Sequence, residues 1–254
     1  MGVRIGTAGW SIPRGVADAF ASEGSQLQRY SGVLESVEIN TTFKHTHRPD
    51  TYVGWASSVG EDFRFAVKFP QAITHQGGLG DDERVRTFLE QVGGLGRKLG
   101  PLLLQFPPRL AFEPEVMEPF WRRIEASGAY QIVCEPRHPS WFTPEVDRWL
   151  ADRRIARVAA DPSPHPKGGV PGGWRGLSYY RLHGAPRMYF SAYPSEVLEA
   201  LLAEIMRDEA GAVWCIFDNT ASGAAANDAL RLKARWAVVR DDPANSPPSG
   251  VQPG

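Results

Sequence analysis

Short apolar runs recur along this chain, and each one ends at a polar or charged residue that precedes a turn. There are eight such runs, with centres near Ile5, Val37, Ala66, Leu103, Val133, Val158, Tyr180 and Cys215. The centres are separated by about thirty residues on average, which is the length of a β-strand plus its crossover helix. The pattern therefore predicts an α/β protein, a single (β/α)8 barrel of the TIM type.

The segments between the apolar runs carry helix signals. Asp81 and Asp82 precede apolar residues at helical spacing, and acidic residues in a first turn suit the positive end of a helix dipole. Thr143 followed by Pro144 is typical of an N-cap and a first helical position. We expect such helices to pack their apolar faces on the barrel.

One connection breaks the pattern, because residues 162–176 contain four prolines and five glycines. No helix is expected in such a segment, so a long loop replaces the sixth helix. We interpret it as a lid over the barrel mouth, with Lys167 and Trp174 as ligand contacts; the alternative is a solvated excursion. The run 241–254 is rich in Pro, Ser and Gly and predicts a disordered tail, which leaves residues 1–240 as one barrel domain.

The composition is that of an ordinary globular protein: 42% of residues are hydrophobic, 22% are charged, and the formal net charge is -1. This charge does not favour a dedicated nucleic-acid binder, although a local basic patch could still bind nucleic acid. Cys134 and Cys215 fall in predicted buried strands and are expected to be packing thiols. With no signal-like start and no membrane-length apolar window, we expect a cytoplasmic protein without a membrane partner. The oligomeric state stays open.

Polar residues at the ends of the strands are the candidates for function, because a βα barrel collects its strand C-termini on the face that carries the active site. Glu38 lies inside an apolar strand, and a buried carboxylate needs a basic or donor partner. Lys68, at the end of the next strand, is the expected partner. The pair is either a structural ion pair or part of the chemistry.

A carboxylate, a guanidinium and an imidazole follow the fifth strand within four residues, as Glu135, Arg137 and His138. This trio can perform acid–base chemistry, with the guanidinium holding an oxyanion. The alternative is that Glu135 and Arg137 brace the loops around the neighbouring prolines.

Arg181 and His183 alternate on the seventh strand, so their side chains share one side with Tyr179. An inward arginine needs an anion, which either a protein carboxylate or a ligand supplies. Aromatic residues gather in the same strand-end regions and suit stacking on a sugar or a base, although such residues also fill barrels. They are Trp10, Trp141, Trp174, Tyr189 and Tyr193.

A divalent metal ion is an alternative, because oxygen and imidazole ligands end strands five to eight. These ligands would be Glu135, Asp161, His183 and Asp218. Lys68, Arg137 and Arg181 already neutralise carboxylates and would repel a cation, so we expect no metal. No zinc-finger, P-loop or dinucleotide motif occurs, and no cofactor is predicted.

Several sequence blocks, in the correct order, resemble the DUF72 family, also called YecE-like. In the first half they are Gly6-Thr-Ala-Gly-Trp-Ser11, Val37-Glu-Ile-Asn-Thr-Thr-Phe43, Phe65-Ala-Val-Lys-Phe-Pro70 with Ile73-Thr-His75, and Leu99-Gly-Pro-Leu-Leu-Leu-Gln-Phe-Pro-Pro108. In the second half they are Glu135-Pro-Arg-His-Pro-Ser-Trp141, Tyr179-Tyr-Arg-Leu-His-Gly184, Phe217-Asp-Asn219 and Ala226-Asn-Asp-Ala229. The resemblance implies a βα barrel but names no reaction, because the family is one of unknown function.

The sequence thus predicts an enzyme, with hydrolysis as the favoured reaction, that binds a small anionic sugar- or nucleotide-like ligand at the barrel mouth. The predicted acid–base residues are Glu38, Glu135, His138 and His183. The predicted ligand contacts, of which His75 is implied by the family resemblance alone, are Trp10, Asn40, Lys68, His75, Gln105, Arg137, Trp141, Asp161, Arg181, Tyr189, Tyr193 and Asn219. Two alternatives stay open: a metal-dependent phosphodiester hydrolase acting on nucleic acid, and a barrel that binds a ligand or partner without catalysis.

Overall fold

The computed structural model of this protein describes residues 2–241. The tail expected at 241–254 lies outside the described residues, apart from Asp241, which is the C-cap of the last helix, α8 (Ala224–Arg240).

Ten strands form one sheet in the described part of the chain; seven of the eight apolar runs form one strand each, and the sixth run forms two. The strand order is β7-β9-β10-β1-β2-β3-β4-β5-β6-β8, and every pairing is parallel except that of β6 with β8. The bounds are β1 (Gly2–Ala8), β2 (Ser36–Ile39), β3 (Arg64–Lys68), β4 (Leu99–Gln105), β5 (Ile132–Glu135), β6 (Ile155–Arg157), β7 (Ala159–Asp161), β8 (Gly172–Gly173), β9 (Leu177–Leu182) and β10 (Ala212–Phe217).

The sheet curls into a nearly closed barrel because the chain changes partner at Val158. Val158 N still donates to Cys134 O of β5 at 2.9 Å, whereas the next residue, Ala159, is in register with Tyr180 of β9. The expected sixth strand is thus split into β6, which pairs with β5, and β7, which pairs with β9. This split and the additional strand β8 account for the difference between the eight predicted strands and the ten observed.

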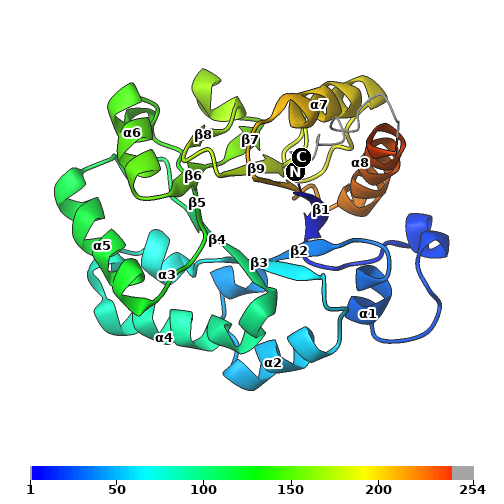
Figure 1. Ribbon diagram of the computed structural model, residues 1–254, viewed down its shortest axis with the longest axis horizontal. Coiled ribbons are helices and arrows are strands. Elements are labelled where there is room, and N and C mark those ends of the chain that lie inside the picture. Colours follow the sequence, from blue (N-terminus) through cyan, green and yellow to red (C-terminus); the bar gives the residue numbers. More distant parts are fainter. Residues whose placement is uncertain (1, 242–254) are drawn as a thin grey trace, which may run out of the picture.

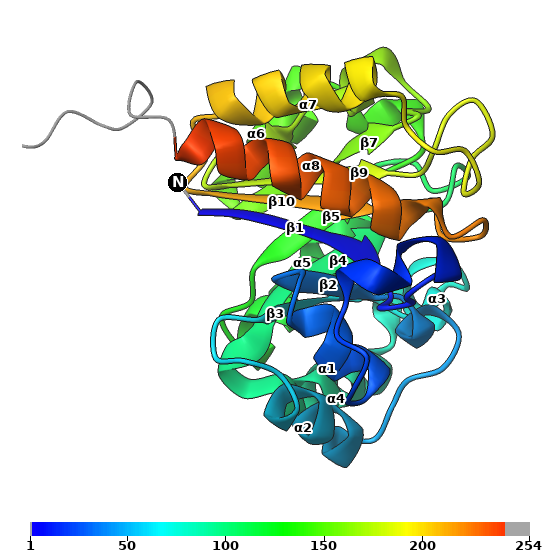
Figure 2. The same ribbon diagram turned by 90° about the vertical axis from the view of Figure 1, so that its right-hand side faces the viewer.

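The helices surround the sheet on its outer side (Figure 1). They are α1 (Gln26–Ser31), α2 (Pro49–Ser57), α3 (Gln71–Thr74), α4 (Asp82–Val92), α5 (Pro114–Ser127), α6 (Pro144–Asp152), α7 (Ser195–Arg207) and α8. Both predicted helix starts are confirmed: Thr143 is the predicted N-cap of α6 and accepts from Val146 N, and Asp81, predicted only as a residue of a first turn, is the N-cap of α4 and accepts from Arg84 N. Helices α7 and α8 pack side by side (Figure 2).

The proline- and glycine-rich connection corrects the prediction of a structureless lid. It contains a 3₁₀ helix, η6 (Pro166–Gly169), and β8, which pairs antiparallel with β6. Arg157 points outward from β6, forms an ion pair with Asp147 of α6, and donates to Lys167 O at 2.8 Å. Residues 166–173 therefore pack on the outer side of the barrel, because the buried Arg157 needs acceptors there.

Trp174, the second expected ligand contact of this segment, packs against the apolar side chains that fill the barrel interior. These interior residues come from alternate positions of the strands, as the two-residue period of a strand requires. They are Ala66, Leu103, Val133, Ala156, Val158, Leu177, Tyr179, Trp214 and Ile216.

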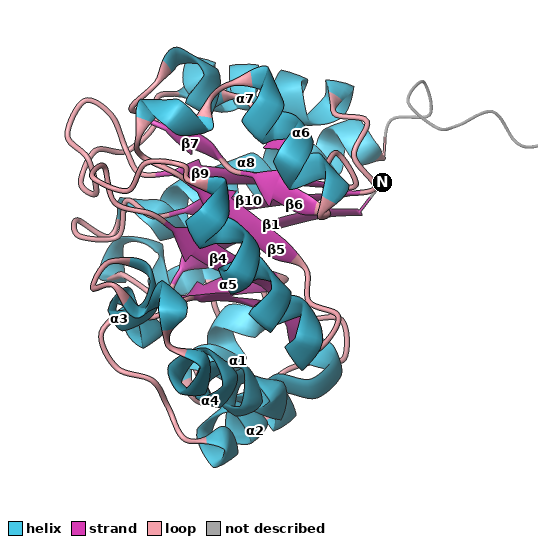
Figure 3. Cartoon of the chain, turned by 90° about the vertical axis from the view of Figure 1, so that its left-hand side faces the viewer, coloured by secondary structure: helices cyan, strands magenta, loops and turns pink. Residues whose placement is uncertain are grey.

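A second, larger apolar cluster lies between the strands and the surrounding helices. Cys134 and Cys215 are buried and free, as predicted. No helix among residues 2–241 has the length and apolar character needed to cross a membrane. Figure 3 shows that long loops gather on the side away from the N-terminus, where the parallel strands end.

Candidate active site

Charged side chains point into the barrel two residues after the apolar side chains that fill its interior. Lys68 follows Ala66 by two residues on β3, Glu135 follows Val133 on β5, and Arg181 follows Tyr179 on β9. Because strand side chains alternate between the two faces, each of these groups points inward at the C-terminal end of its strand. We call the whole set the ionic centre; its members are Glu38, Lys68, Glu135, Arg137, Arg181, His183 and Asp218.

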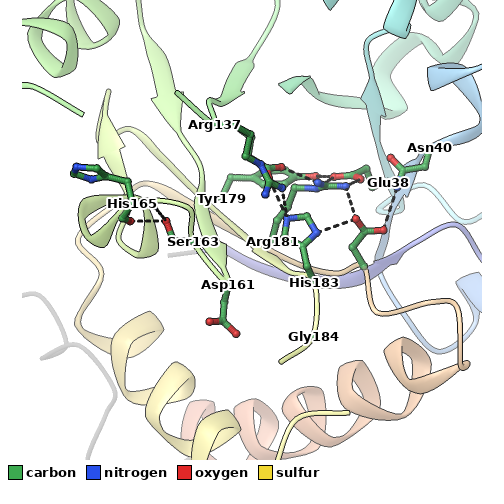
Figure 4. A network of polar contacts seen from close by, with 12 residues as sticks. Glu38, Asn40, Arg137, Asp161, Ser163, His165, Tyr179, Arg181, His183 and Gly184 are labelled. Atoms are coloured by element: carbon green, nitrogen blue, oxygen red, sulfur yellow. Dashed lines mark hydrogen bonds and ion pairs between the residues drawn. The ribbon is translucent and has the colours of Figure 1, made fainter. Parts of the chain in front are cut away.

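Arg181 joins the carboxylates of the ionic centre (Figure 4). Its Nε and Nη2 donate to Glu38 Oε2 and Oε1 at 2.9 and 2.6 Å in a bidentate fork. Nη1 donates to Glu135 Oε2 at 2.7 Å, and Nη2 donates to Asp218 Oδ2 at 3.0 Å. A second donor, Tyr179 Oη, reaches Glu38 Oε2 at 2.8 Å. Both carboxylate oxygens of Glu38 therefore accept hydrogen bonds.

This pairing keeps the buried groups charged. Burial alone would raise the pKa of Glu135, but the charges of Arg181, His183 and Arg137 hold that pKa well below its usual value. Burial likewise opposes the charge of Arg181, yet Glu38, Asp218 and Glu135 raise its pKa well above the usual value. A buried charge without such partners would cost several kcal/mol, roughly, so the arginine and the carboxylates depend on one another.

The predicted pair of Glu38 with Lys68 does not form, because Arg181 takes the place expected for the lysine. Lys68 Nζ lies 4.2 Å from the centroid of the Phe43 ring, and no hydrogen bond or ion pair of the described residues uses it. Burial and the neighbouring charge of Arg181 lower the pKa of Lys68 to about 8, against the opposing effect of the carboxylates. Arg181 pairs with Glu38 because a guanidinium can bind several carboxylates at once through directed donors, whereas an ammonium is a point charge.

His183 connects two carboxylates of the ionic centre. Nδ1 lies 3.0 Å from Asp218 Oδ2, and Nε2 lies 3.0 Å from Glu135 Oε1 and 3.1 Å from Arg137 Nη2. A protonated Nε2 donates to Glu135, whereas an unprotonated Nε2 accepts from Arg137. Burial would lower the pKa of His183, but Glu135 and Asp218 raise it overall. His183 Nε2 can therefore donate its proton to Glu135 Oε1, and after losing that proton it can accept a hydrogen bond from Arg137 Nη2.

Two buried polar atoms, one in the ionic centre and one beside it, lack protein partners. Arg137 Nη2 donates to Glu135 Oε1, but Arg137 Nε is buried without a partner. Asn40 Nδ2 donates to Asp218 Oδ1 at 3.3 Å, while Asn40 Oδ1 is also buried and unpaired. Together with Lys68 Nζ, these atoms offer two donors and one acceptor to an additional group. Unpaired buried polar atoms are rare in folded proteins and mark places where a ligand or water completes the structure.

Aromatic side chains line the rim around these atoms. The Tyr189 ring meets the His183 ring edge-on at 5.6 Å and is 40% exposed. Trp10 packs edge-on against Trp55 and lines a cavity of about 330 Å³ together with Asn40. The Phe43 ring, over which Lys68 Nζ lies, also meets the His75 ring edge-on at 5.0 Å. Gln105 ends β4 in register with Glu135 of β5.

Five other residues that the sequence placed in the site have different surroundings. His138 Nδ1 accepts from Ser140 N and caps the 3₁₀ helix η5 (Pro139–Trp141), so the imidazole beside Glu135 is that of His183. Trp141 is buried against Phe106, and its Nε1 donates to Leu110 O. The side chain of Asp161 points away from the network, as Figure 4 shows.

Tyr193 and Asn219 hold the loop that follows β9. Tyr193 Oη accepts from Gly184 N and donates to Asp161 O, and Asn219 Nδ2 donates to Ser191 O and Asp228 Oδ2. Both residues therefore position the loop that carries Tyr189.

Three members of the site were not among the residues predicted to perform chemistry or contact a ligand. Asp218 directly follows β10 and was considered only as a metal ligand, and Tyr179 was noted only for sharing the direction of Arg181. Their inward positions follow from the strand period, which was the available signal. Phe43, under Lys68, lies after β2 in the 3₁₀ helix η2 (Thr41–Phe43), where no such period applies.

The geometry also bears on a metal ion. Among residues 2–241 no group of three or more His, Cys, Asp or Glu side chains is arranged to hold one. The carboxylate oxygens that face the interior contact guanidinium or imidazole nitrogens instead.

The sequence of this chain matches a known protein family over almost its full length. The family model described as "Protein of unknown function DUF72" matches residues 4–251. The chain belongs to the DUF72 family.

Relatives of this DUF72 protein include the UPF0759 protein YecE of Escherichia coli strain K12, which is 31% identical over 169 residues. That match covers 64% of this chain and 60% of the relative, so it spans less than two thirds of that protein's length. The UPF0759 protein YunF of Bacillus subtilis strain 168 is 27% identical over 149 residues, covering 56% of this chain and 53% of that protein.

Solved structures of the DUF72 family resemble this fold over almost its full length. A DUF72 family protein from Enterococcus faecalis V583 matches with a TM-score of 0.79 at 22% identity, covering 92% of this chain and 95% of that one. A DUF72 family protein from Thermotoga maritima MSB8 matches with a TM-score of 0.78 at 25% identity, covering 93% of this chain and 100% of that one. These likenesses show the shared α/β barrel-like fold.

Proposed function

We propose that this DUF72 protein binds a small anionic molecule at the mouth of the barrel, beside Lys68 and Arg137, and that His183 and Glu135 exchange a proton with it. The observation that carries the proposal is the pair of unpaired nitrogen donors, Lys68 Nζ and Arg137 Nε, in a network where all three nitrogens of Arg181 are satisfied. A ligand oxygen with negative charge is the natural partner for both.

The charge balance of the ionic centre supports an anion. The carboxylates of Glu38, Glu135 and Asp218 are opposed by three basic side chains, those of Lys68, Arg137 and Arg181. The raised pKa of His183 favours its imidazolium form and leaves one net positive charge. An anion bound beside Lys68 and Arg137 neutralises that charge.

The proton-transfer role rests on His183 Nε2, which lies between Glu135 Oε1 and Arg137 Nη2. When Nε2 gives its proton away, it can accept from Arg137 without rotation of the ring. The imidazole is held in place from its other side by Asp218, which is how a carboxylate orients a general acid or base. This pair takes the role that the sequence had assigned to Glu135 with His138.

The body of the ligand would lie toward Trp10. The cavity of about 330 Å³ that Trp10 lines also contains Ser11, Gln26 and Asn40, and Asn40 bonds to Asp218 of the ionic centre. An indole beside hydroxyl and amide groups suits a sugar ring or a nucleobase. Hydrolysis remains the reaction that we predicted from sequence, and the proposal here is limited to proton transfer at a bound anion.

We also infer that β6 and β7 act as one bent strand, so that residues 1–240 fold as one barrel of eight βα units. The inference is supported by their separation by a single residue, Val158, and by their pairing with successive neighbours of the barrel.

The test is a thermal-unfolding series with inorganic phosphate against sodium chloride at equal ionic strength. A ligand that binds only the native state stabilises it by mass action, by about 2.7 kcal/mol at 100 times the dissociation constant. We expect phosphate to raise Tm of the native protein and of Lys167→Met, a substitution of an exposed lysine in η6. Lys68→Met should abolish the increase.

An equal increase in all three proteins would contradict the proposal, as would no increase in any of them. Where a metabolite screen with the same readout finds a ligand, analysis of the products separates the enzyme from a barrel that only binds. The expected result is a ligand that is altered by the native protein and left intact by His183→Gln.

A further inference from the structure

We propose that Lys68 forms a Schiff base with the carbonyl carbon of an anionic aldehyde or ketone bound at the barrel mouth. The inference rests on the proposed function, because the anionic group of this ligand would be held beside Lys68 by Arg137. It adds the substrate class, and it gives Lys68 a covalent role.

The position of Lys68 favours this role. Lys68 is the last residue of β3, points into the barrel and is 8% exposed, so its amine is reachable only from the mouth. Within residues 2–241 its Nζ makes no hydrogen bond or ion pair and lies over the Phe43 ring. Other half-buried lysines are tied down: Lys98 Nζ donates to Ala56 O and Val59 O, and Lys233 Nζ pairs with Glu35.

A lysine attacks a carbonyl only as the neutral amine, and its surroundings supply that form. Desolvation and a neighbouring cation are the two means by which proteins activate such a lysine. Both act here, because burial and the charge of Arg181 lower the pKa of Lys68 to about 8. About a tenth of the amine is then neutral at pH 7.

Charged groups face Lys68 from several elements of the barrel. They are Glu38 on β2, Glu135 on β5, Arg181 on β9, Asp218 after β10 and His75 after α3. The carboxylates raise the pKa of Lys68, but burial and the charge of Arg181 lower it by more, so the net shift is downward.

The reaction balances without an oxidant or reductant. The Lys68 lone pair attacks the carbonyl carbon, a C–N bond forms, and the carbonyl electron pair moves to oxygen, which takes up a proton while nitrogen loses one. The resulting carbinolamine loses its hydroxyl group as water, with a second proton added to the leaving oxygen and removed from nitrogen, and the C=N bond forms. His183 Nε2, with Glu135 beside it, is the group that can give and recover these protons.

The anionic part of the ligand follows from Arg137. Its buried Nε lacks a partner, and a guanidinium binds either a carboxylate or a phosphate through directed donors. The chemistry common to the candidate ligands is therefore a carbonyl group within a few bonds of an anion, as in a 2-oxo acid or a sugar phosphate.

The experiment traps the imine. The purified full-length protein is incubated at pH 7 with sodium cyanoborohydride and one of three probes: pyruvate, glyceraldehyde 3-phosphate or uncharged glyceraldehyde. Reduction of an imine leaves a stable secondary amine, which peptide mass mapping assigns to a residue. We expect Lys68 to be labelled about tenfold or more faster than the exposed Lys44 and Lys167, because burial and Arg181 lower the pKa of Lys68 and so favour its neutral amine.

The three probes distinguish the sources of the anion. Selective labelling by pyruvate points to a carboxylate ligand, and selective labelling by glyceraldehyde 3-phosphate points to a phosphate ligand. Either outcome supports the proposal when glyceraldehyde labels Lys68 more slowly. Lys68→Arg should lose the adduct, and Lys167→Arg should keep it. The labelling site in the native protein decides the matter even if Lys68→Arg folds poorly.

Labelling that is spread over exposed lysines in the same proportion as Lys68 overturns the inference. Stabilisation by phosphate without labelling of Lys68 overturns the inference alone and leaves the proposed anion binding standing. Absence of both effects overturns both proposals.

Discussion

Arg181 and Lys68 show how two basic residues can differ within one network. The Arg181 guanidinium satisfies Glu38, Glu135 and Asp218 at once and is fully buried, while the Lys68 ammonium carries its charge without a directed partner. A charge that is buried but not paired lowers stability, and functional sites commonly retain such groups at the expense of stability. We therefore expect the charged Lys68 to lower the stability of the native protein.

Replacement of Lys68 by Met should stabilise the native protein at pH 7 by about 1–3 kcal/mol, since one pKa unit corresponds to about 1.4 kcal/mol. Because the pKa of Lys68 is lowered to about 8, its charged amine destabilises the folded state relative to the unfolded chain, and this cost is fully present below pH 8. This cost decreases as pH rises from about 8 toward 10.5, the ordinary pKa of a lysine in an unfolded chain. The gain from Lys68→Met should therefore shrink over that range in urea unfolding experiments.

Lys167→Met is the matched control and should change the free energy of unfolding by less than about 0.5 kcal/mol, as exposed substitutions usually do. A clear loss of stability in Lys68→Met at pH 7 would mean that the ammonium is paired.

The protonation of His183 should make the stability of the protein depend on pH. Its pKa is raised in the folded state, so its stabilising effect is complete below about 6.5 and is lost as pH rises through the folded-state pKa. The pKa values of Glu135 and Asp218 are lowered, so their contribution is present above their usual values and is lost as pH falls through the folded-state values.

His183→Gln should therefore remove part of the decrease in stability that the native protein shows in urea unfolding as pH rises above about 6.5. His45→Gln, a substitution of an exposed histidine, should keep the decrease. The assignment of an imidazolium to His183 fails if both variants keep the same pH dependence as the native protein.

At the scale of elements, the sixth connection shows how a segment without a long helix can still cover a strand. Arg157 on the outer face of β6 donates to Asp147 Oδ1 at 2.9 Å and to Lys167 O, and Gly173 N donates to the same Asp147 oxygen at 3.2 Å. Gly173 has φ +62, and an added Cβ would lie 2.6 Å from Ile155 O. Only a glycine allows the backbone to approach β6 this closely.

Asp147→Asn should loosen this connection. The substitution leaves the buried Arg157 without its carboxylate, which costs about 1–3 kcal/mol, and it weakens the acceptor for Gly173 N. We expect faster amide hydrogen exchange at Gly173 and Gly168 by at least a few fold.

Asp152→Asn, at an exposed position of the same helix, should leave these exchange rates unchanged. If exchange at Gly173 is unaffected in Asp147→Asn, then the ion pair does not hold the segment.

At the scale of the whole molecule, the barrel interior is filled across its width. Gly100 on β4 and Trp214 on β10 are separated in the sheet by three intervening strands, yet a Cβ added to Gly100 would lie 2.7 Å from the Trp214 ring. The large ring thus occupies the space that the missing side chain leaves, in keeping with the dense packing of protein interiors.

Gly100→Ala should destabilise the protein by about 1–3 kcal/mol through overpacking. Trp214→Phe removes atoms from the same space, so the double variant should lose less stability than the sum of the two single variants. A double-mutant cycle of urea unfolding measures this coupling. Strictly additive losses would show that the two residues do not meet across a filled barrel.

Much of this protein could be predicted from the order of its residues. The apolar runs gave the strands, Asp81 and Thr143 gave helix starts, and the polar residue at each strand end gave most of the ionic centre. These features are local, because a strand repeats every two residues and an N-cap is decided within one turn. Parallel strands then bring their ends to one face, so residues distant in the chain converge.

Only the tertiary structure decided which of these polar groups pair. Arg181 rather than Lys68 binds Glu38, His183 rather than His138 stands beside Glu135, and Asp161 points away although it ends a strand. The sequence lists the charges, but the pairing depends on distances and directions set by strand register, by the change of partner at Val158 and by the reach of each side chain. Those quantities come from contacts between elements far apart in the chain, which no local pattern encodes.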